Sequence, residues 1–171
     1  MLFSYKNIYS KMAQNFEIDK LDRQILSILI KDSTVPYTEI AKELVVSAGT
    51  IHVRMKKLIE LGVVVGSHLE INPVKAGYDI CAFLGIFLEK GSEYHDCVSR
   101  MKKIPEIVEL HYTTGVYSMF AKIICRDTQH LREVLNEYIQ PIKGVQRTET
   151  FISLEESIKR QVEIKEKKIR L

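Results

Sequence analysis

The sequence has no long apolar run, and this absence argues against a membrane-spanning protein. Its longest apolar run, Ile80–Leu88, has 9 residues if Gly85 is included, whereas a helix needs about 20 residues to cross a bilayer. The first 16 residues mix Lys, Asn, Gln and Ser with apolar residues, so they lack the continuous hydrophobic stretch of a secretory signal. We therefore expect a cytoplasmic protein without a membrane partner.

Cysteine is also scarce. Only Cys81, Cys97 and Cys125 are present, which is too few for a disulfide scaffold, and they lack the CxxC spacing of a zinc site. We expect three reduced, buried thiols, no bound metal and no cofactor.

A large excess of charge of one sign is missing too. The 25 Lys and Arg residues nearly balance the 22 Asp and Glu residues, and the resulting net charge of +3 neither indicates nor excludes a nucleic-acid partner. With 46% hydrophobic and 27% charged residues, the composition is that of an ordinary globular protein. A length of 171 residues suits one large domain or two small ones.

Up to about residue 75, the sequence has a helical pattern. Asp19 is a suitable N-cap for a first helix that runs to about Lys31, and Pro36 interrupts the pattern after it. A short helix over residues 37–44 and a longer one over residues 48–61 follow. The first part of the chain is therefore predicted to hold three helices.

The longest of these helices has clear boundaries. Ser47 is placed to cap it, and Gly62 is placed to end it in the left-handed conformation. Its apolar residues form a single stripe: Ile51, Met55, Leu58 and Leu61. We expect two short strands, residues 63–65 and 69–71, to follow as a β-wing.

From residue 80 onward, the pattern alternates between strand and helix. We expect strands over residues 80–89, 107–113, 117–125 and 145–154, and helices over residues 93–103 and from Asp127 or Thr128. The second helix would turn four side chains inward: Leu131, Val134, Leu135 and Tyr138.

The β-α-β-β-α-β order is that of the ferredoxin-like fold, a four-stranded antiparallel sheet with two helices on one face. The chain is thus predicted to be an α+β protein. The other sheet face would be apolar and uncovered, which monomers rarely allow, so we expect a dimer or higher oligomer. A basic tail, residues 157–171, follows, and we favour a solvated, frayed helix over a second nucleic-acid contact there.

Residues 37–62 carry the strongest functional signal, because a short helix, a tight turn and a capped longer helix form a helix-turn-helix layout. Small and polar residues at the start of the longer helix, from Ser47 to Thr50, allow the backbone to approach a duplex. Arg54 and Lys57, one turn apart, are placed to contact phosphates. A three-helix domain with an ordinary solvated face is the alternative, and His52 is equally compatible with a DNA contact or a plain surface position.

Four segments resemble one known family. VSAGTIHVRMKKLIELGVVVG is similar to the recognition helix and wing of the Lrp/AsnC family of transcription regulators. GYDICAFLGIFL, YTTGVYSMFAKIICR and QRTETFISL resemble the family's ferredoxin-like ligand-binding module, the RAM domain, and especially that of its asparagine-responsive member. The resemblance covers residues 18–154.

The resemblance implies a domain organisation and a set of DNA contacts. It implies an N-terminal extension (1–17), a winged helix-turn-helix domain (18–72), a linker (73–79), an effector-binding and dimerisation domain (80–155) and the basic tail (156–171). It also implies that the helix over residues 48–61 enters the major groove of double-stranded DNA. The implied contact residues are Ser47, Gly49, Thr50, His52, Val53, Arg54 and Lys57.

The resemblance further implies a homodimer, assembling to higher oligomers such as an octamer, with an amino-acid effector bound between subunits. The implied effector residues are Tyr112, Thr114, Gly115, Val116, Tyr117, Ser118, Gln146, Thr148 and Thr150. Ser118 stands where many members carry an acidic residue, so the effector's amine must be bound by another group, and asparagine is the favoured effector. Ala48 replaces a common proline at the first helical position, where proline is favoured without being required.

We therefore expect a DNA-binding transcription regulator controlled by an amino acid, with no catalytic residues. An effector-independent DNA-organising protein of the same fold is the alternative. An enzyme, or a regulatory subunit of one, is disfavoured because Asp96, Glu109 and His111 form no convincing catalytic group.

Overall fold

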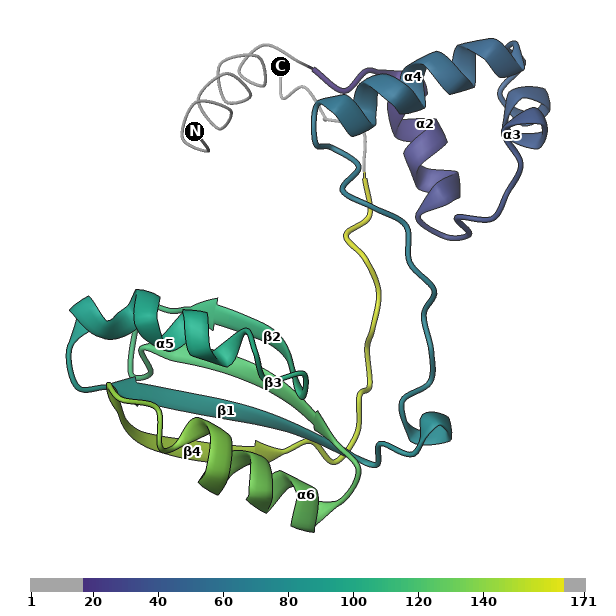
Figure 1. Ribbon diagram of the computed structural model, residues 1–171. Coiled ribbons are helices and arrows are strands. Elements are labelled where there is room, and N and C mark those ends of the chain that lie inside the picture. Colours follow the sequence, from purple (N-terminus) through teal and green to yellow (C-terminus); the bar gives the residue numbers. More distant parts are fainter. Residues whose placement is uncertain (1–16, 165–171) are drawn as a thin grey trace. The chain divides into compact units, whose positions relative to one another are not determined.

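The structure, a computed structural model, describes residues 17–164. This part of the chain divides into two compact units, one formed by residues 17–69 and 159–164 and the other by Glu70–Ile158. Figure 1 shows the helices and strands of both units, and each unit has its own apolar core. The expected N-terminal extension, except Glu17, and the last residues of the expected tail, 165–171, lie outside the described residues.

The first unit contains the three predicted helices: α2 (Lys20–Leu29), α3 (Tyr37–Glu43) and α4 (Ala48–Glu60). Asp19 caps α2 and Ser47 caps α4, which confirms both predicted helix starts. The helices bury one face each and share a core made of Ile25, Leu26, Ile40, Ala41, Ile51, Met55 and Leu58.

The turn between α3 and α4 is closed by a Schellman motif. The Val46 N–H donates to the Ala41 carbonyl at 2.9 Å, and the Val45 N–H donates to the Lys42 carbonyl at 3.3 Å. This motif requires a left-handed residue, which is usually glycine, and here Val45 fills that position with a φ of 54°. The side chain of Val45 is 89% exposed, so no burial offsets the backbone strain.

The predicted wing strands, residues 63–65 and 69–71, do not form. The described chain between α4 and a short 3-10 helix, η1 (Val74–Ala76), contains no strand, and Val65 and Leu69 are almost fully exposed. Val63 and Val64 pack against the three-helix core, but Val65, Leu69 and Ile71 are exposed, and an isolated pair of short strands is only marginally stable, which accounts for the difference.

The described part of the basic tail also differs from expectation. Residues 157–164 form no helix. Residues 159–164 belong to the first unit, where Ile164 packs against the core of its three helices. Burial of this one side chain gives the end of the chain an apolar anchor that a frayed, solvated helix would lack.

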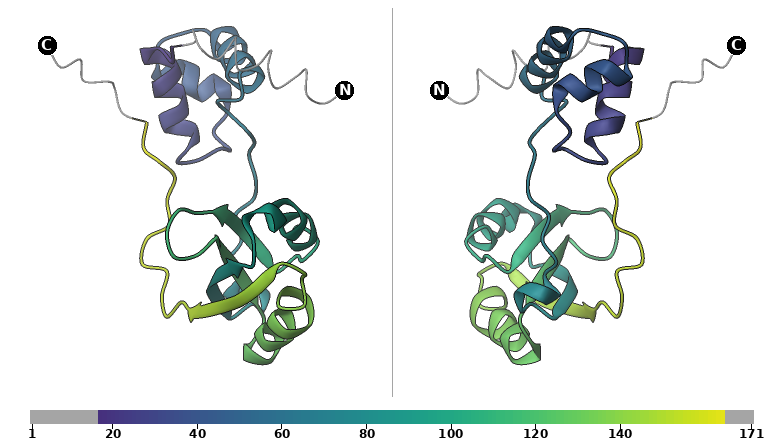
Figure 2. Two further views of the ribbon diagram at one scale, coloured as in Figure 1. Left: turned by 90° about the vertical axis from the view of Figure 1, so that its left-hand side faces the viewer. Right: turned by 90° about the vertical axis from the view of Figure 1, so that its right-hand side faces the viewer.

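The second unit has the predicted ferredoxin-like order. Its elements are β1 (Ile80–Leu88), η2 (Gly91–Glu93), α5 (Tyr94–Met101), β2 (Ile107–Tyr112), β3 (Met119–Cys125), α6 (Thr128–Glu133), η3 (Val134–Ile139) and β4 (Val145–Ile152). The sheet is antiparallel in the order β2-β3-β1-β4. Both helices cover the same sheet face (Figure 2).

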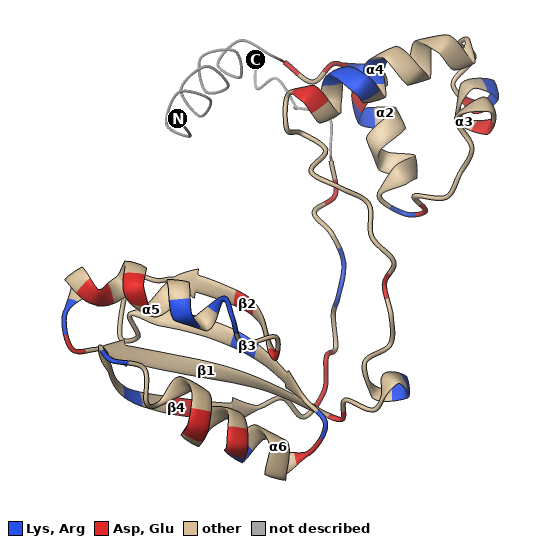
Figure 3. Cartoon of the chain, viewed as in Figure 1, with Lys and Arg blue, Asp and Glu red and all other residues tan. Residues whose placement is uncertain are grey.

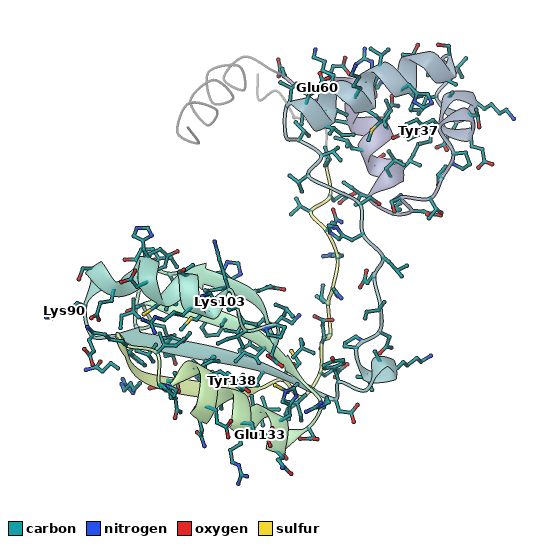
Figure 4. All side chains as sticks on the ribbon, in the orientation of Figure 1. Tyr37, Glu60, Lys90, Lys103, Glu133 and Tyr138 are labelled. Carbon is teal, nitrogen blue, oxygen red and sulfur yellow. The ribbon has the colours of Figure 1, made fainter. Side chains whose placement is uncertain are left out.

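The helix that begins as α6 changes from an α-helical to a π-helical repeat at Val134. It continues as a π-helix, η3, in which Gln140 N donates to the Leu135 carbonyl five residues earlier. Because the wider turn shifts the inward face by a residue, Ile139 is buried and Tyr138 is exposed on η3 (Figure 4). The prediction that Tyr138 points inward was therefore wrong.

The sheet face away from the helices is named the open sheet face. Alternation along the strands, with the register of β1 against β3 and β4, assigns its residues. Its middle is formed by Phe83, Gly85, Phe87, Phe120, Lys122, Ile124, Arg147, Glu149 and Phe151. Phe83 and Phe120 are stacked with ring centroids 5.9 Å apart, so the face is apolar and aromatic, as predicted.

Candidate DNA-binding and effector-binding sites

The outer face of α4 is uncharged at the start of the helix and carries basic residues from the middle of the helix onward. Residues 48–53 carry no charge, Arg54, Lys56 and Lys57 follow, and Glu60 stands at the C-terminal end. Figure 3 shows the same order as tan, blue and red along α4. Gly49, His52 and Val53 are exposed on the same helix. The arrangement offers a close backbone approach at one end and phosphate attraction toward the other.

Ser47 and Thr50 are tied to one another at the start of α4. The Ser47 hydroxyl oxygen accepts from the Thr50 N–H at 3.1 Å and lies 2.9 Å from the Thr50 hydroxyl. Beside them, a Cβ on Gly49 would meet nothing nearer than the Ser47 Oγ, at 3.7 Å, which is an ordinary contact. The protein's own packing therefore does not require glycine there, and the open space above Gly49 is available to a ligand.

His52 has a neighbour that the sequence did not reveal. Its ring meets Tyr37, at the start of α3 (Figure 4), with centroids 4.7 Å apart and planes at 71°. This edge-on contact joins the two helices of the helix-turn-helix and restricts the orientation of the exposed imidazole.

Arg54 is used inside the first unit. Its Nη1 contacts Asp19 Oδ2 and lies 3.0 Å from Asp22 Oδ1. Asp19 and Asp22 already form a reciprocal capping box at the start of α2, and the Asp22 side chain is 5% exposed. The Asp22 amide and the Arg54 guanidinium together lower the pKa of Asp19. Arg54 thus joins α4 to the start of α2, a contact that nothing in the sequence indicates apart from the charges of the three residues.

In the second unit, the predicted effector turn joins β2 to β3. The Thr113 N–H donates to the Ser118 carbonyl at 3.2 Å, and the Thr113 hydroxyl donates to the Tyr117 carbonyl at 2.7 Å. Gly115, exposed at the tip, has a φ of 115° that only glycine adopts easily. Among the described residues, the N–H groups from Thr114 to Tyr117 have no backbone acceptor, so this turn presents several donors to an anionic group.

The remaining predicted effector residues lie elsewhere in the unit. Gln146, Thr148 and Thr150 are on β4, the opposite edge strand of the sheet from β2. Thr148 accepts from Gln140 Nε2 at 3.3 Å on the helix-covered face, whereas Tyr117 lies over the open sheet face. In one copy of the chain, Thr148 and Thr150 therefore lie on the opposite face of the sheet from the Tyr117 ring.

Three further residues lie against predicted ones and were missed from the sequence. Tyr94 of α5 packs on Tyr112 with ring centroids 4.3 Å apart. Glu149 accepts from the Tyr117 hydroxyl at 2.8 Å and from Arg147 at 2.6 Å. The alternation of β4 places Arg147 and Glu149 on one face, but their contact with Tyr117 depends on how the turn folds over the sheet.

The described residues offer few other groups that could bind a metal ion or react covalently. Cys97 and Cys125 are buried and Cys81 is half-buried, and all three thiols are free. Within residues 17–164, no group of three His, Cys, Asp or Glu side chains is placed to hold a metal ion. None of the helices described is long and apolar enough to cross a membrane.

Both units match families of known proteins. Residues 18–65 match the winged helix-turn-helix DNA-binding model, and residues 81–163 match the Lrp/AsnC ligand-binding domain. The two units together define a DNA-binding regulator with a ligand-binding domain. The chain belongs to the Lrp/AsnC family of transcription regulators.

Its relatives include the regulatory protein AsnC. The chain is 40% identical to AsnC of Escherichia coli over 149 residues, covering 87% of this chain and 98% of that protein. It is 42% identical to AsnC of Haemophilus influenzae over 85% of this chain and 97% of that one. The E. coli AsnC structure superposes with a TM-score of 0.83, at 38% identity, over 87% of this chain and all of that one.

A feast or famine regulatory protein from M. tuberculosis, solved with L-methionine, superposes with a TM-score of 0.81 at 26% identity. The match covers 86% of this chain and 100% of that one.

Proposed function

We propose that this protein is a cytoplasmic transcription regulator that inserts the start of α4 into the major groove of DNA and binds an amino acid between subunits. The proposed contact residues of α4 and its N-cap are the predicted ones without Arg54, which contacts Asp19 and Asp22: Ser47, Gly49, Thr50, His52, Val53 and Lys57. Asparagine is the first candidate for the effector, because the AsnC relatives share most of the chain's length.

The observation that carries the DNA-binding half is the open space above Gly49. Glycine is a poorer helix former than alanine, by roughly 1 kcal/mol in a helix interior, and no contact within the described part of the first unit requires it at this first-turn position. A DNA duplex that approaches the start of α4 would explain the glycine, because a side chain at position 49 would hold the backbone away from the base edges.

Gly49→Ala tests this half directly. The variant should melt at the same temperature as the wild type or higher, yet bind the promoter adjoining its own coding region at least tenfold more weakly in an anisotropy titration. Ile59→Ala, which truncates another exposed side chain of α4, is the matched control and should bind normally. Unchanged DNA affinity in Gly49→Ala would remove the start of α4 from the interface.

The effector-binding half is supported by the amides from Thr114 to Tyr117, which have no backbone acceptor among the described residues and suit an α-carboxylate. Since Thr148 and Thr150 lie on the other sheet edge, an effector that also reaches them needs residues from two copies of the chain. We propose that the open sheet face joins two copies into a homodimer, because monomers rarely expose so large an apolar surface, and that dimers assemble further.

Calorimetric titration with each of the twenty amino acids tests the effector. Binding of L-asparagine, together with a changed DNA affinity at saturation, would support control by that amino acid through coupling of typically 1–3 kcal/mol. DNA binding with no heat from any amino acid would instead favour the effector-independent, DNA-organising alternative.

A further inference from the structure

Gly85 is an unexpected residue at the centre of the sheet. It lies in the middle of β1, with strands paired on both sides, between Phe83 and Phe87 on the open sheet face. Glycine weakens a strand interior and often marks a place where another group approaches closely. That group is the ring of Tyr117: a Cβ on Gly85 would lie 2.4 Å from the Tyr117 Cε1 atom and 2.5 Å from its Cδ1 atom.

The Tyr117 ring is held on several sides. Its centroid lies 5.2 Å from that of Phe87, 5.8 Å from that of Phe120 and 6.3 Å from that of Phe151, residues of three different strands. Its hydroxyl donates to Glu149 Oε2 at 2.8 Å. The ring therefore has one defined place, set by packing and by a hydrogen bond at its tip.

Glu149 is itself fixed. It accepts from Arg147 at 2.6 Å, and the Arg147 guanidinium carbon lies 3.6 Å from the Phe87 ring centroid. The hydrogen bond from Tyr117, with the Arg147 charge, lowers the pKa of Glu149, so the acceptor stays ionised at neutral pH. The anchor of the hydroxyl is thus a charged, oriented carboxylate.

The same residue closes the effector turn. The Tyr117 carbonyl accepts from the Thr113 hydroxyl, and the next residue, Ser118, donates its N–H to the Ile86 carbonyl at 2.9 Å. The turn amides that have no backbone acceptor among the described residues immediately precede this point. Tyr117 is the last residue of the run from Thr114 to Tyr117. Fixing its ring therefore also restricts the backbone that carries these amides.

We propose that Tyr117 is a positioning residue for effector binding: its ring, seated over Gly85 and anchored by Glu149, fastens the turn from Thr113 to Ser118 in its binding conformation. The proposal rests on the effector half of the proposed function. Its physical basis is pre-organisation, because a turn already ordered in the free protein loses less conformational entropy when the ligand binds. Because Gly85 of β1 has no side chain, it leaves the space that the Tyr117 ring occupies.

Two variants and a control separate this role from a general loss of packing. Gly85→Ala displaces the whole ring, and Tyr117→Phe removes only the hydroxyl. Phe83→Leu is the control, because Phe83 lies on the same face and stacks on Phe120. All are compared as full-length chains, after sedimentation has shown that their oligomeric state equals that of the wild type.

The first measurement needs no ligand. Two amides report on the turn: the Thr113 N–H, which donates across it to the Ser118 carbonyl, and the Ser118 N–H, which joins it to Ile86 of β1. Their hydrogen exchange should be at least tenfold faster in Gly85→Ala, several-fold faster in Tyr117→Phe and unchanged in Phe83→Leu. Exchange in Gly85→Ala at the wild-type rate would overturn the proposal, because the turn would then be ordered without the seated ring.

The second measurement is calorimetric titration with L-asparagine. The dissociation constant should rise at least tenfold in Gly85→Ala and about threefold to tenfold in Tyr117→Phe, with Phe83→Leu near the wild type. Faster exchange with an unchanged dissociation constant would overturn the positioning role while leaving the proposed effector intact. If the wild-type protein binds none of the twenty amino acids, the effector half of the proposed function fails, and the positioning role fails with it.

Discussion

Replacing Val45 by glycine should stabilise the first unit, although it removes a side chain. Val45 occupies the left-handed position of the turn between α3 and α4, with a φ of 54°. For residues other than glycine, the left-handed region costs roughly 1–2 kcal/mol, and a β-branched side chain lies toward the upper end of that range. The substitution relieves this cost at a position that belongs to the helix-turn-helix.

Two losses oppose the gain. The side chain is 89% exposed, so its removal sacrifices little apolar burial. Glycine makes the unfolded chain more flexible, which costs roughly 0.5–1 kcal/mol. The net stabilisation is therefore about 1 kcal/mol, equivalent to a rise in Tm of about 4–8 °C for a domain of this small size.

Differential scanning calorimetry of the full chain measures the change in the transition of the first unit. Val45→Asn should recover part of the gain, since asparagine tolerates the left-handed region, and Val45→Ala should recover less. A Tm for Val45→Gly equal to or below that of the wild type would refute the reasoning, because it would mean that valine is unstrained in this turn.

Three further predictions concern ion pairs and thiols. Arg54→Ala should destabilise the first unit by about 2 kcal/mol in chemical denaturation, because Asp22 is left without its cation in a nearly buried site. The slope of the logarithm of DNA affinity against the logarithm of salt concentration should stay unchanged in this variant. A slope lower by about one would instead assign Arg54 to a phosphate contact. The lowered pKa of Asp19 contributes stability that is complete above about pH 4 and is lost as the pH falls through that pKa. The Tm should therefore decrease below about pH 4 when it is measured between pH 6 and pH 2, and Asp19→Asn should make this decrease smaller. Burial raises the pKa of Cys125 to about 11, so a thiol reagent at pH 8 should leave Cys125 unmodified in the native protein and label Cys81 first, whereas fast labelling of Cys125 would contradict its burial.

Much of the local structure could be predicted from sequence, because its causes are local. The caps at Asp19 and Ser47 lie within three residues of the amides they accept from, and Gly62 ends α4 by its own backbone preference. The order of strands and helices in the second unit follows from the change between a period of two and a period of 3.6 in apolar residues. These features need no knowledge of distant neighbours.

The incorrect predictions depend on interactions that a short window does not contain. The wing strands had suitable residues, but strand formation needs a packing partner, and the described chain provides one only for Val63 and Val64. The inward position of Tyr138 assumed an α-helical repeat, whereas the helix widens at Val134 into a π-helix. The grouping of the effector residues stays a prediction, because the sheet of one copy places β2 and β4 at opposite edges and the site was expected between subunits.

By itself, the sequence determined the helix-turn-helix, the ferredoxin-like order and the apolar character of the open sheet face, because hydrophobic period and capping chemistry are properties of neighbouring residues. Only the tertiary structure decided that Arg54 binds Asp19 and Asp22, more than 30 residues away, and that Tyr117 fills the space above Gly85 and reaches Glu149. Such contacts depend on how separate elements pack, since the chemistry of an arginine or a tyrosine permits many partners and the fold selects one.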